Sequence, residues 1–189
     1  MAEALEFVAP ASCCQFLLFE GSDPDGLMEA NVGILTDDMK RMLKEQQLGF
    51  IATVCPDGTP NLSPKGTTAV WDDEHLIFAD VCSPNTIANL RQNPVLEINV
   101  VDMLLRKGYR FKGVATIVSE GPQFEELLDF YRSRGSTSVK HHIVLVKVER
   151  ADPLISPAYD NGQSEGQVSA RWRRYWEELW NRRSNPRID

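Results

Sequence analysis

The chain has 189 residues, of which 42% are hydrophobic and 25% are charged, and its formal net charge at pH 7 is −7. These proportions are ordinary for a globular protein with one sizeable core. The acidic balance argues against general nucleic-acid binding, which needs a basic surface.

The sequence also argues against a membrane or secretory setting. No apolar run approaches the ~20 residues that cross a bilayer, and the N-terminus lacks the basic start of a signal peptide. The four cysteines are Cys13, Cys14, Cys55 and Cys82, and none of them forms a CxxC motif. A vicinal pair does not indicate an ordinary disulfide framework, so we expect a reduced, cytoplasmic protein without nucleic-acid or membrane partners.

The first elements along the chain are a helix and a hairpin. Residues 1–35 have weak periodicity and are predicted to be an N-terminal extension. The stretch "TDDMKRMLKEQQ" (36–47) begins with a suitable N-cap threonine and two acids, which predicts a helix. A strand at 48–54 follows, and Asp57-Gly58 is a strong hairpin signal before a return strand at 59–70.

The remaining elements alternate short strands with helices. Ser83 and Pro84 suit the start of a helix at 83–93, which Asn93-Pro94 ends. The other predicted elements are strands 75–81, 95–101, 109–118 and 142–150, a helix at 121–135, a loop at 151–166 and a helix at 167–182. Six strands with short, mostly antiparallel connections predict a mainly β fold, a small closed barrel with peripheral helices. We expect the barrel domain to span 36–150 and a C-terminal loop and amphipathic helix to span 151–189.

Lys65 is the first candidate for a functional residue. It lies in the strand predicted at 59–70, between Pro64 and Gly66. Proline and glycine inside a strand tend to mark an edge, a bulge or a close approach by another group. We expect this strand to pair with strand 75–81, which would bring Lys65 near the start of helix 83–93.

The start of that helix is a candidate phosphate site. Its free N–H groups and positive dipole end attract anions. Ser83 and Thr86 add hydroxyl groups, Asn85 adds an amide, and Lys65 adds a full charge. Two further cations, Arg110 and Lys112, share one face of strand 109–118. The alternative stays open that these residues only begin a helix and cover exposed strands.

Three stretches together resemble a known family. They are "LGFIATVCPDGTPNLSPKG", "HLIFADVCSPNTIANLRQNPVLEINVVD" and "KGYRFKGVATIV". They are similar to the pyridoxamine 5′-phosphate oxidase-like family of FMN-binding split-barrel proteins, in particular a branch with "NLSPKG" and "SPAYD". The resemblance covers roughly residues 36 to 180.

The resemblance implies a six-stranded antiparallel split β-barrel that forms a homodimer with FMN at the subunit interface. It implies an FMN-dependent oxidoreductase with an unknown small-molecule substrate. The alternatives are a flavin-binding or sensor module without turnover, one that holds another flavin, a deazaflavin or haem, and an interaction protein without a ligand. The residues implied to bind the cofactor are Asn61, Ser63, Pro64, Lys65, Phe78, Ala79, Asp80, Ser83, Asn85, Thr86, Arg110 and Lys112. No catalytic residue is assigned, because the flavin would carry the redox chemistry.

The sequence departs from the family at the phosphate site. Pro84 and Asn85 follow the serine at the helix start, where the true oxidases have arginine and lysine. The arginine- and tryptophan-rich C-terminal signature of those oxidases is also absent. We therefore do not expect pyridoxamine phosphate oxidase activity.

The histidines and tryptophans complete the candidates. His141 and His142 point to opposite faces of a strand and His75 is isolated, so no metal site is expected. Trp172, Trp176 and Trp180 recur every four residues on one side of the last helix. This stripe is either a docking face, against the barrel or the dimer mate, or an aromatic wall over the flavin.

Overall fold

A computed structural model of the protein describes residues 33–136 and 141–184. The chain divides into a short N-terminal unit, Met1–Asn31, and a main unit, Val32–Asp189. Most of the predicted extension over residues 1–35 therefore lies outside the described residues, as do Cys13 and Cys14. In the described part of the chain, no helix is long and apolar enough to cross a membrane.

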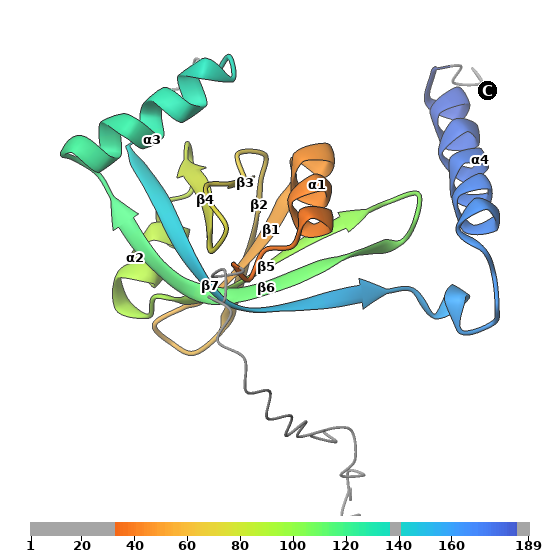
Figure 1. The fold of residues 1–189 in the computed structure, drawn as a ribbon, viewed down its shortest axis with the longest axis horizontal. Helices are drawn as coiled ribbons and strands as arrows, with labels where there is room; N and C mark the ends of the chain where they lie inside the picture. The colour runs from red at the N-terminus through yellow and green to blue at the C-terminus, as the bar shows by residue number, and fades with distance from the viewer. Residues whose placement is uncertain (1–32, 137–140, 185–189) are drawn as a thin grey trace, which may run out of the picture. The chain divides into compact units, whose positions relative to one another are not determined.

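The main unit contains seven strands and four α-helices among its described residues (Figure 1). In chain order they are α1 (Asp37–Gln46), β1 (Gly49–Val54), β2 (Pro60–Lys65), β3 (Ala69–Val70), β4 (His75–Asp80), α2 (Pro84–Gln92), β5 (Val95–Asp102), β6 (Lys107–Val118), α3 (Pro122–Ser133), β7 (His142–Ile155) and α4 (Glu165–Ser184). A 3₁₀ turn, Pro157–Tyr159, lies between β7 and α4. The N-cap of α1 is Thr36, whose Oγ1 accepts the backbone N–H of Met39 at 3.4 Å.

All seven strands form one antiparallel sheet with the order β2-β1-β5-β6-β7-β4-β3. The two edge strands, β2 and β3, are separated in the sequence by residues 66–68 alone. The sheet must therefore curl until its edges meet, which makes a split barrel with helices around it. The mainly β fold class expected from the sequence is confirmed.

The prediction of one strand over residues 59–70 was wrong. β2 ends at Lys65, where the chain turns, and Thr68 Oγ1 donates to the carbonyl of Lys65 at 3.0 Å. β2 then pairs with β1, and β3 pairs with β4, with Ala69 opposite Ile77. The strand splits because its two halves pair at opposite edges of the sheet, which also raises the strand number from the predicted six to seven.

The predicted boundary between strand and loop at residue 150 was also wrong. β7 continues to Ile155 and stays paired with β6, with a bulge between Lys112 and Gly113. β4 pairs only with residues 142–147 of β7, so the later half of β7 has one free edge. Pro153 is tolerated there because an edge strand needs no donor on its open side.

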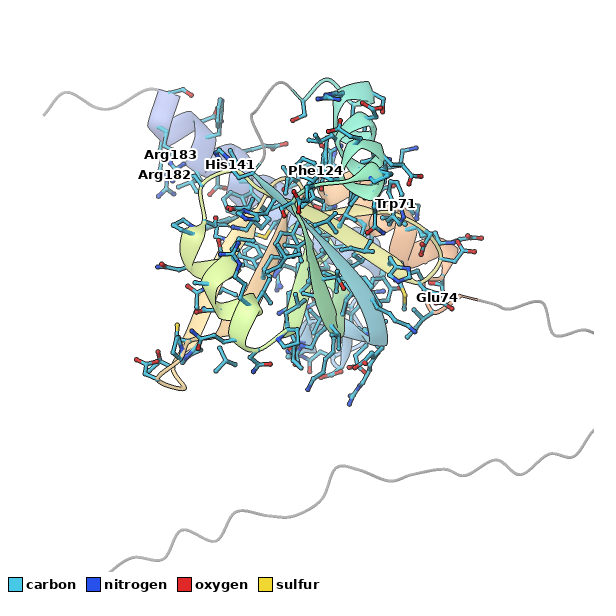
Figure 2. All side chains as sticks on the ribbon, turned by 90° about the vertical axis from the view of Figure 1, so that its left-hand side faces the viewer. Trp71, Glu74, Phe124, His141, Arg182 and Arg183 are labelled. Carbon is cyan, nitrogen blue, oxygen red and sulfur yellow. The ribbon has the colours of Figure 1, made fainter. Side chains whose placement is uncertain are left out.

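Two apolar clusters hold the helices to the sheet. The larger one fills the inside of the curled sheet and includes Ile51, Phe78, Ile98 and Phe111. The second lies under α3, where Leu127 and Tyr131 pack on Ile77, Ala79 and Ile143, and partly buried Trp71 and Phe124 adjoin it (Figure 2). β4 contributes to both clusters, which explains why its sequence is a continuous apolar run.

Candidate functional site

Lys65 is a buried cation at the end of β2. Only 6% of the residue is exposed. Its Nζ donates a hydrogen bond to Ser63 Oγ at 2.8 Å and a second one to Ser83 Oγ. Burial lowers the pKa of Lys65, and the negative charge of Asp80 partly opposes that shift. A buried ammonium with two neutral acceptors keeps a strong capacity to bind an anion.

Ser83 joins Lys65 to the start of α2. It holds the N-cap position, but its side chain does not cap the helix. Its Oγ accepts from Lys65, and its backbone N–H donates to Asp80 Oδ1 at 2.8 Å. The first N–H groups of a helix have no intrahelical acceptor, so the positive end of α2 faces this group of side chains. The predicted meeting of Lys65 with Ser83 is therefore present, although β2 does not pair with β4.

Thr86 and Asn85 differ in their surroundings. Thr86 is buried, and its backbone N–H donates to the carbonyl of Ser83 at 3.1 Å. Asn85 is exposed on the first turn of α2. Of these two side chains, only that of Asn85 is open to a ligand in solution.

A histidine not predicted as a site residue extends this cluster. His142 lies opposite Asp80 in the β4–β7 register, and its Nδ1 is 3.4 Å from Asp80 Oδ2. Arg91 Nη2 is 3.0 Å from His142 Nε2. A guanidinium can only donate, so Nε2 is the acceptor in this contact, and Nδ1 is the ring atom that faces Asp80. Sequence reasoning missed this contact because it depends on strand register across 62 positions of the chain.

Phe78 and Ala79 contribute core packing. Phe78 is fully buried in the larger apolar cluster and Ala79 in the one beneath α3. The backbone N–H of Ala79 donates to Thr67 Oγ1 at 2.9 Å, and Thr67 Oγ1 donates to the Ala79 carbonyl at 3.2 Å. These two bonds connect the turn after Lys65 to β4.

Asn61 belongs to a separate polar cluster. Its amide donates to Thr53 Oγ1 at 3.1 Å, and the amide of Asn89 donates to the same atom at 3.0 Å. The Asn89 amide is also 3.5 Å from Cys55 Sγ. Asn61 is four residues before Lys65 on β2, which corresponds to about 13 Å along a strand. The structure does not bring Asn61 to the Lys65 cluster.

Arg110 and Lys112 lie on the other face of the sheet. Arg110 is opposite Asn99, which is opposite Phe50, which in turn is opposite Pro64. Residues paired in this way point to one face, so Arg110 shares its face with Pro64 and not with Lys65. Arg110 is exposed and pairs with Glu97 at 3.4 Å. Within one subunit these two cations do not add to the charge at Lys65.

A cavity of about 590 Å³ adjoins the turn after Lys65. Small-molecule sites commonly have volumes of this order. Its basic side chains are Lys40, which pairs with Asp73 at 2.7 Å, Lys44, and Arg134, whose guanidinium lies 3.8 Å from the ring centre of Phe130. It is lined by Lys40, Leu43, Lys44, Gln47, Gly66, Thr67, Thr68, Ala69, Val70, Tyr131, Arg134 and Ser136. Sequence reasoning missed this cavity, because α1, the turn and α3 are distant along the chain.

The described histidines and cysteines form no metal centre. Across residues 33–136 and 141–184, no group of three or more His, Cys, Asp or Glu side chains is arranged to hold a metal ion. His75 Nδ1 contacts Asp72 Oδ1 at 2.9 Å. Cys55 is half-buried and Cys82 is exposed, and neither forms a disulfide.

Comparisons with known proteins agree with this fold. HupZ of Group A Streptococcus is 34% identical, with a TM-score of 0.59 over 64% of this chain and 94% of that one. An FMN-binding protein of Syntrophomonas wolfei shares the fold at 16% identity, with a TM-score of 0.54 over 63% of this chain and 85% of that one.

A curated relative adds a sequence match. An uncharacterised protein of Methanocaldococcus jannaschii is 34% identical over 92 residues, which are 46% of this chain. The match spans 58% of the length of that relative. The protein-family model for pyridoxamine 5′-phosphate oxidase matches residues 35–154, well over half of the chain. The chain therefore belongs to the pyridoxamine 5′-phosphate oxidase family.

Proposed function

We propose that the protein is a homodimeric oxidoreductase that binds FMN and uses it to oxidise or reduce a small molecule. The observation that carries the proposal is the buried Lys65, held between two serine hydroxyls at the start of α2. The proposal is supported by the fold shared with an FMN-binding protein of Syntrophomonas wolfei and, at 17% identity and a TM-score of 0.50, with a FAD-binding protein of Mesorhizobium loti.

The donors at this site suit a phosphate group. Lys65 Nζ, Ser83 Oγ and the exposed amide of Asn85 surround the positive end of α2, and all can donate to phosphate oxygens. Asp80 is the one acid in the group, and its charge opposes an anion. Its Oδ1 already accepts the backbone N–H of Ser83, and its Oδ2 faces His142, so both oxygens are directed at groups of the chain itself.

The cavity beside Gly66 suits a ring or a substrate. A Cβ built on Gly66 would meet only the carbonyl of Gln47, at 4.0 Å, so the backbone here is open to a flat group. A bound flavin supplies hydride or electron transfer. The part of this chain would be to exclude water and to hold the charge of Lys65 near the cofactor, which favours an anionic reduced form. The basic rim formed by Lys44 and Arg134 favours an anionic substrate.

Exposed apolar side chains on the outer face of the sheet favour the proposed homodimer. Phe50 is 39% exposed and Leu62 is 65% exposed on neighbouring strands. Large apolar side chains exposed in this way are typical of an interface. A second copy packed on this face would bury both residues and bring Arg110 and Lys112 to the subunit boundary.

Two of the three histidines are engaged by other side chains, whereas His141 is exposed. The His75 ring is engaged by Asp72, and the His142 ring is engaged by Arg91 and faces Asp80. Binding an iron through either ring would require breaking these contacts. The family's named reaction is not proposed for this chain, because Pro84 and Asn85 stand where the oxidases have arginine and lysine.

The test is an FMN titration followed by visible absorption and flavin fluorescence. We expect stoichiometric uptake by the wild type, loss of affinity in Lys65→Met, and no change in Lys147→Met, a control at an exposed lysine on β7. Equal affinity in all three proteins would refute the phosphate role of Lys65. Bound FMN that NAD(P)H and a panel of reductants leave oxidised would favour a non-catalytic flavin carrier.

A further inference from the structure

The C-terminal helix α4 has an aromatic stripe along one side. The spacing of three and four residues puts six side chains on one face. They are Val168, Trp172, Tyr175, Trp176, Leu179 and Trp180. Only Val168 is fully buried within this helix. We call these six residues the aromatic stripe.

The start of the stripe is covered by the chain's own β5–β6 hairpin. The Arg106 guanidinium lies 4.1 Å from the ring centre of Trp172, and Lys107 pairs with Glu165 at 2.6 Å. Tyr159 OH donates to the carbonyl of Leu105 at 2.7 Å, just before the helix begins. These contacts fix the first two turns of α4 on the hairpin.

The rest of the stripe is uncovered. Trp176 is 37% exposed, Tyr175 49% and Trp180 70%. In addition, Nε1 of Trp172 is buried without a hydrogen-bond acceptor among the described residues. The covered and uncovered parts form one continuous face. Val168 is buried at its start, whereas farther along the helix nothing among the described residues covers Tyr175, Trp176 and Trp180 to the same degree.

The charges on α4 indicate which kind of surface would cover it. The helix carries five arginines against three glutamates, and Arg182 and Arg183 lie on its last turn (Figure 2). In residues 33–136 and 141–164, Asp and Glu number seventeen against thirteen Lys and Arg. A second copy therefore offers an acidic surface to a basic helix.

We propose that the aromatic stripe of α4 packs against the barrel of a second copy of this chain. The inference rests on the homodimer proposed above and adds the element that joins the two subunits. Tryptophan and arginine are the residue types that most often dominate interface energies. The flanking arginines would meet the acids of the partner barrel, and the tryptophans would be removed from water.

The experiment measures the dimer dissociation constant by sedimentation equilibrium. The test variant is Trp176→Ser with Trp180→Ser. The matched control is Arg174→Ser with Asn181→Ser, two changes on the opposite side of the same helix. We expect the test variant to weaken the dimer about tenfold or more and the control to stay within about twofold. Circular dichroism checks that α4 remains helical in both.

A second measurement covers the case in which the test variant fails to fold. Hydrogen exchange of the wild-type backbone over residues 175–184 is followed across a dilution series, and we expect protection to fall as the dimer dissociates. If the Trp176→Ser/Trp180→Ser variant has the wild-type dissociation constant, and α4 exchange in the wild type does not change on dilution, this inference is overturned. The homodimer itself would remain. A wild type that is monomeric at all concentrations would overturn both the homodimer and the packing of α4 on a partner. FMN uptake by that monomer would still be measured as a separate test of cofactor binding. Binding of the monomer to phosphatidylserine vesicles through α4 would also overturn this inference.

Discussion

Lys65 and Lys112 are both strand lysines followed by glycine, yet the fold gives them opposite surroundings. Lys65 ends β2 on the inner side of the sheet, where it is 6% exposed and bonded to Ser63 and Ser83. Lys112 lies in β6 on the outer side and is exposed. The difference shows that the face of the sheet, and not the local "KG" sequence, decides whether a lysine is desolvated.

The glycines that follow these lysines also differ. Gly66 lies in a turn with open space around it, whereas a Cβ on Gly113 would lie 2.2 Å from the carbonyl of Lys147. Gly113 therefore allows β6 and β7 to approach each other at the bulge. Gly66 leaves room beside a buried charge. One glycine serves packing, and the other leaves a cavity wall free of side chains.

The largest expected effect contrasts the two faces of β6. Phe111 is 1% exposed and fills the inner cluster, whereas its neighbour Lys112 points outward. We expect Phe111→Ala to lower the free energy of unfolding by about 3–5 kcal/mol. Lys112→Ala should change it by about 0.5 kcal/mol or less. Urea unfolding measures both, and comparable losses would contradict the assignment of the two faces.

The second prediction separates ligand binding from stability. Lys65→Met removes charge-assisted bonds to the proposed phosphate, so we expect the dissociation constant for FMN to rise about 10–100-fold. The free energy of unfolding should change by less than about 1 kcal/mol, because an apolar side chain of similar length replaces a buried cation. Calorimetry and urea unfolding give the two values. If Lys112→Met weakens FMN as much, then burial is not what distinguishes the two lysines.

The third prediction concerns alkaline pH. Burial lowers the pKa of Lys65 below its usual 10.5, so the folded protein releases that proton before the unfolded chain does. The unfolded state then binds more protons between the two pKa values, and stability must rise with pH in that window. We expect urea midpoints to increase there in the wild type and to increase less in Lys65→Met. A steeper rise in the variant would reverse the sign of the Lys65 effect.

The smallest effect is expected at the cavity wall. Tyr131 OH donates to the carbonyl of Thr67 at 2.8 Å, and burial raises the pKa of Tyr131. We expect Tyr131→Phe to lower the free energy of unfolding by about 1 kcal/mol. Because the folded state holds this proton longer than the unfolded chain, wild-type stability should fall above pH ~10, and the variant should lose that fall. Thermal melts at several pH values measure it.

Local signals in the sequence were enough for most of the elements. The Thr36 cap, the Asp57-Gly58 turn and the Ser83-Pro84 helix start each depend on chemistry within a few residues, and helices or turns begin there. The break after Lys65 was missed because alternation continues through it. Only the pairing of β2 and β3 at opposite sheet edges reveals it.

The candidate site was predictable only in part, because some of its contacts depend on long-range pairing. Lys65 and Ser83 were expected together, and the structure joins them. His142 and Arg91 were not expected, because a strand register and a helix position set their contacts. Arg110 and Lys112 were assigned to one face correctly, but no sequence pattern says which face of a curled sheet is inside.

The turn over residues 66–68 has a further consequence for motion. It joins the two edges of the sheet, between which no strand ladder runs. Across this line the barrel is held by side chains, through the bonds of Thr67 to Ala79 and of Lys65 to Ser83. Side-chain bonds of this kind open at lower free energy than a continuous ladder. Fluctuations of the barrel should therefore concentrate along one line, and the residues that we propose to bind an anion are the same ones that hold that line closed.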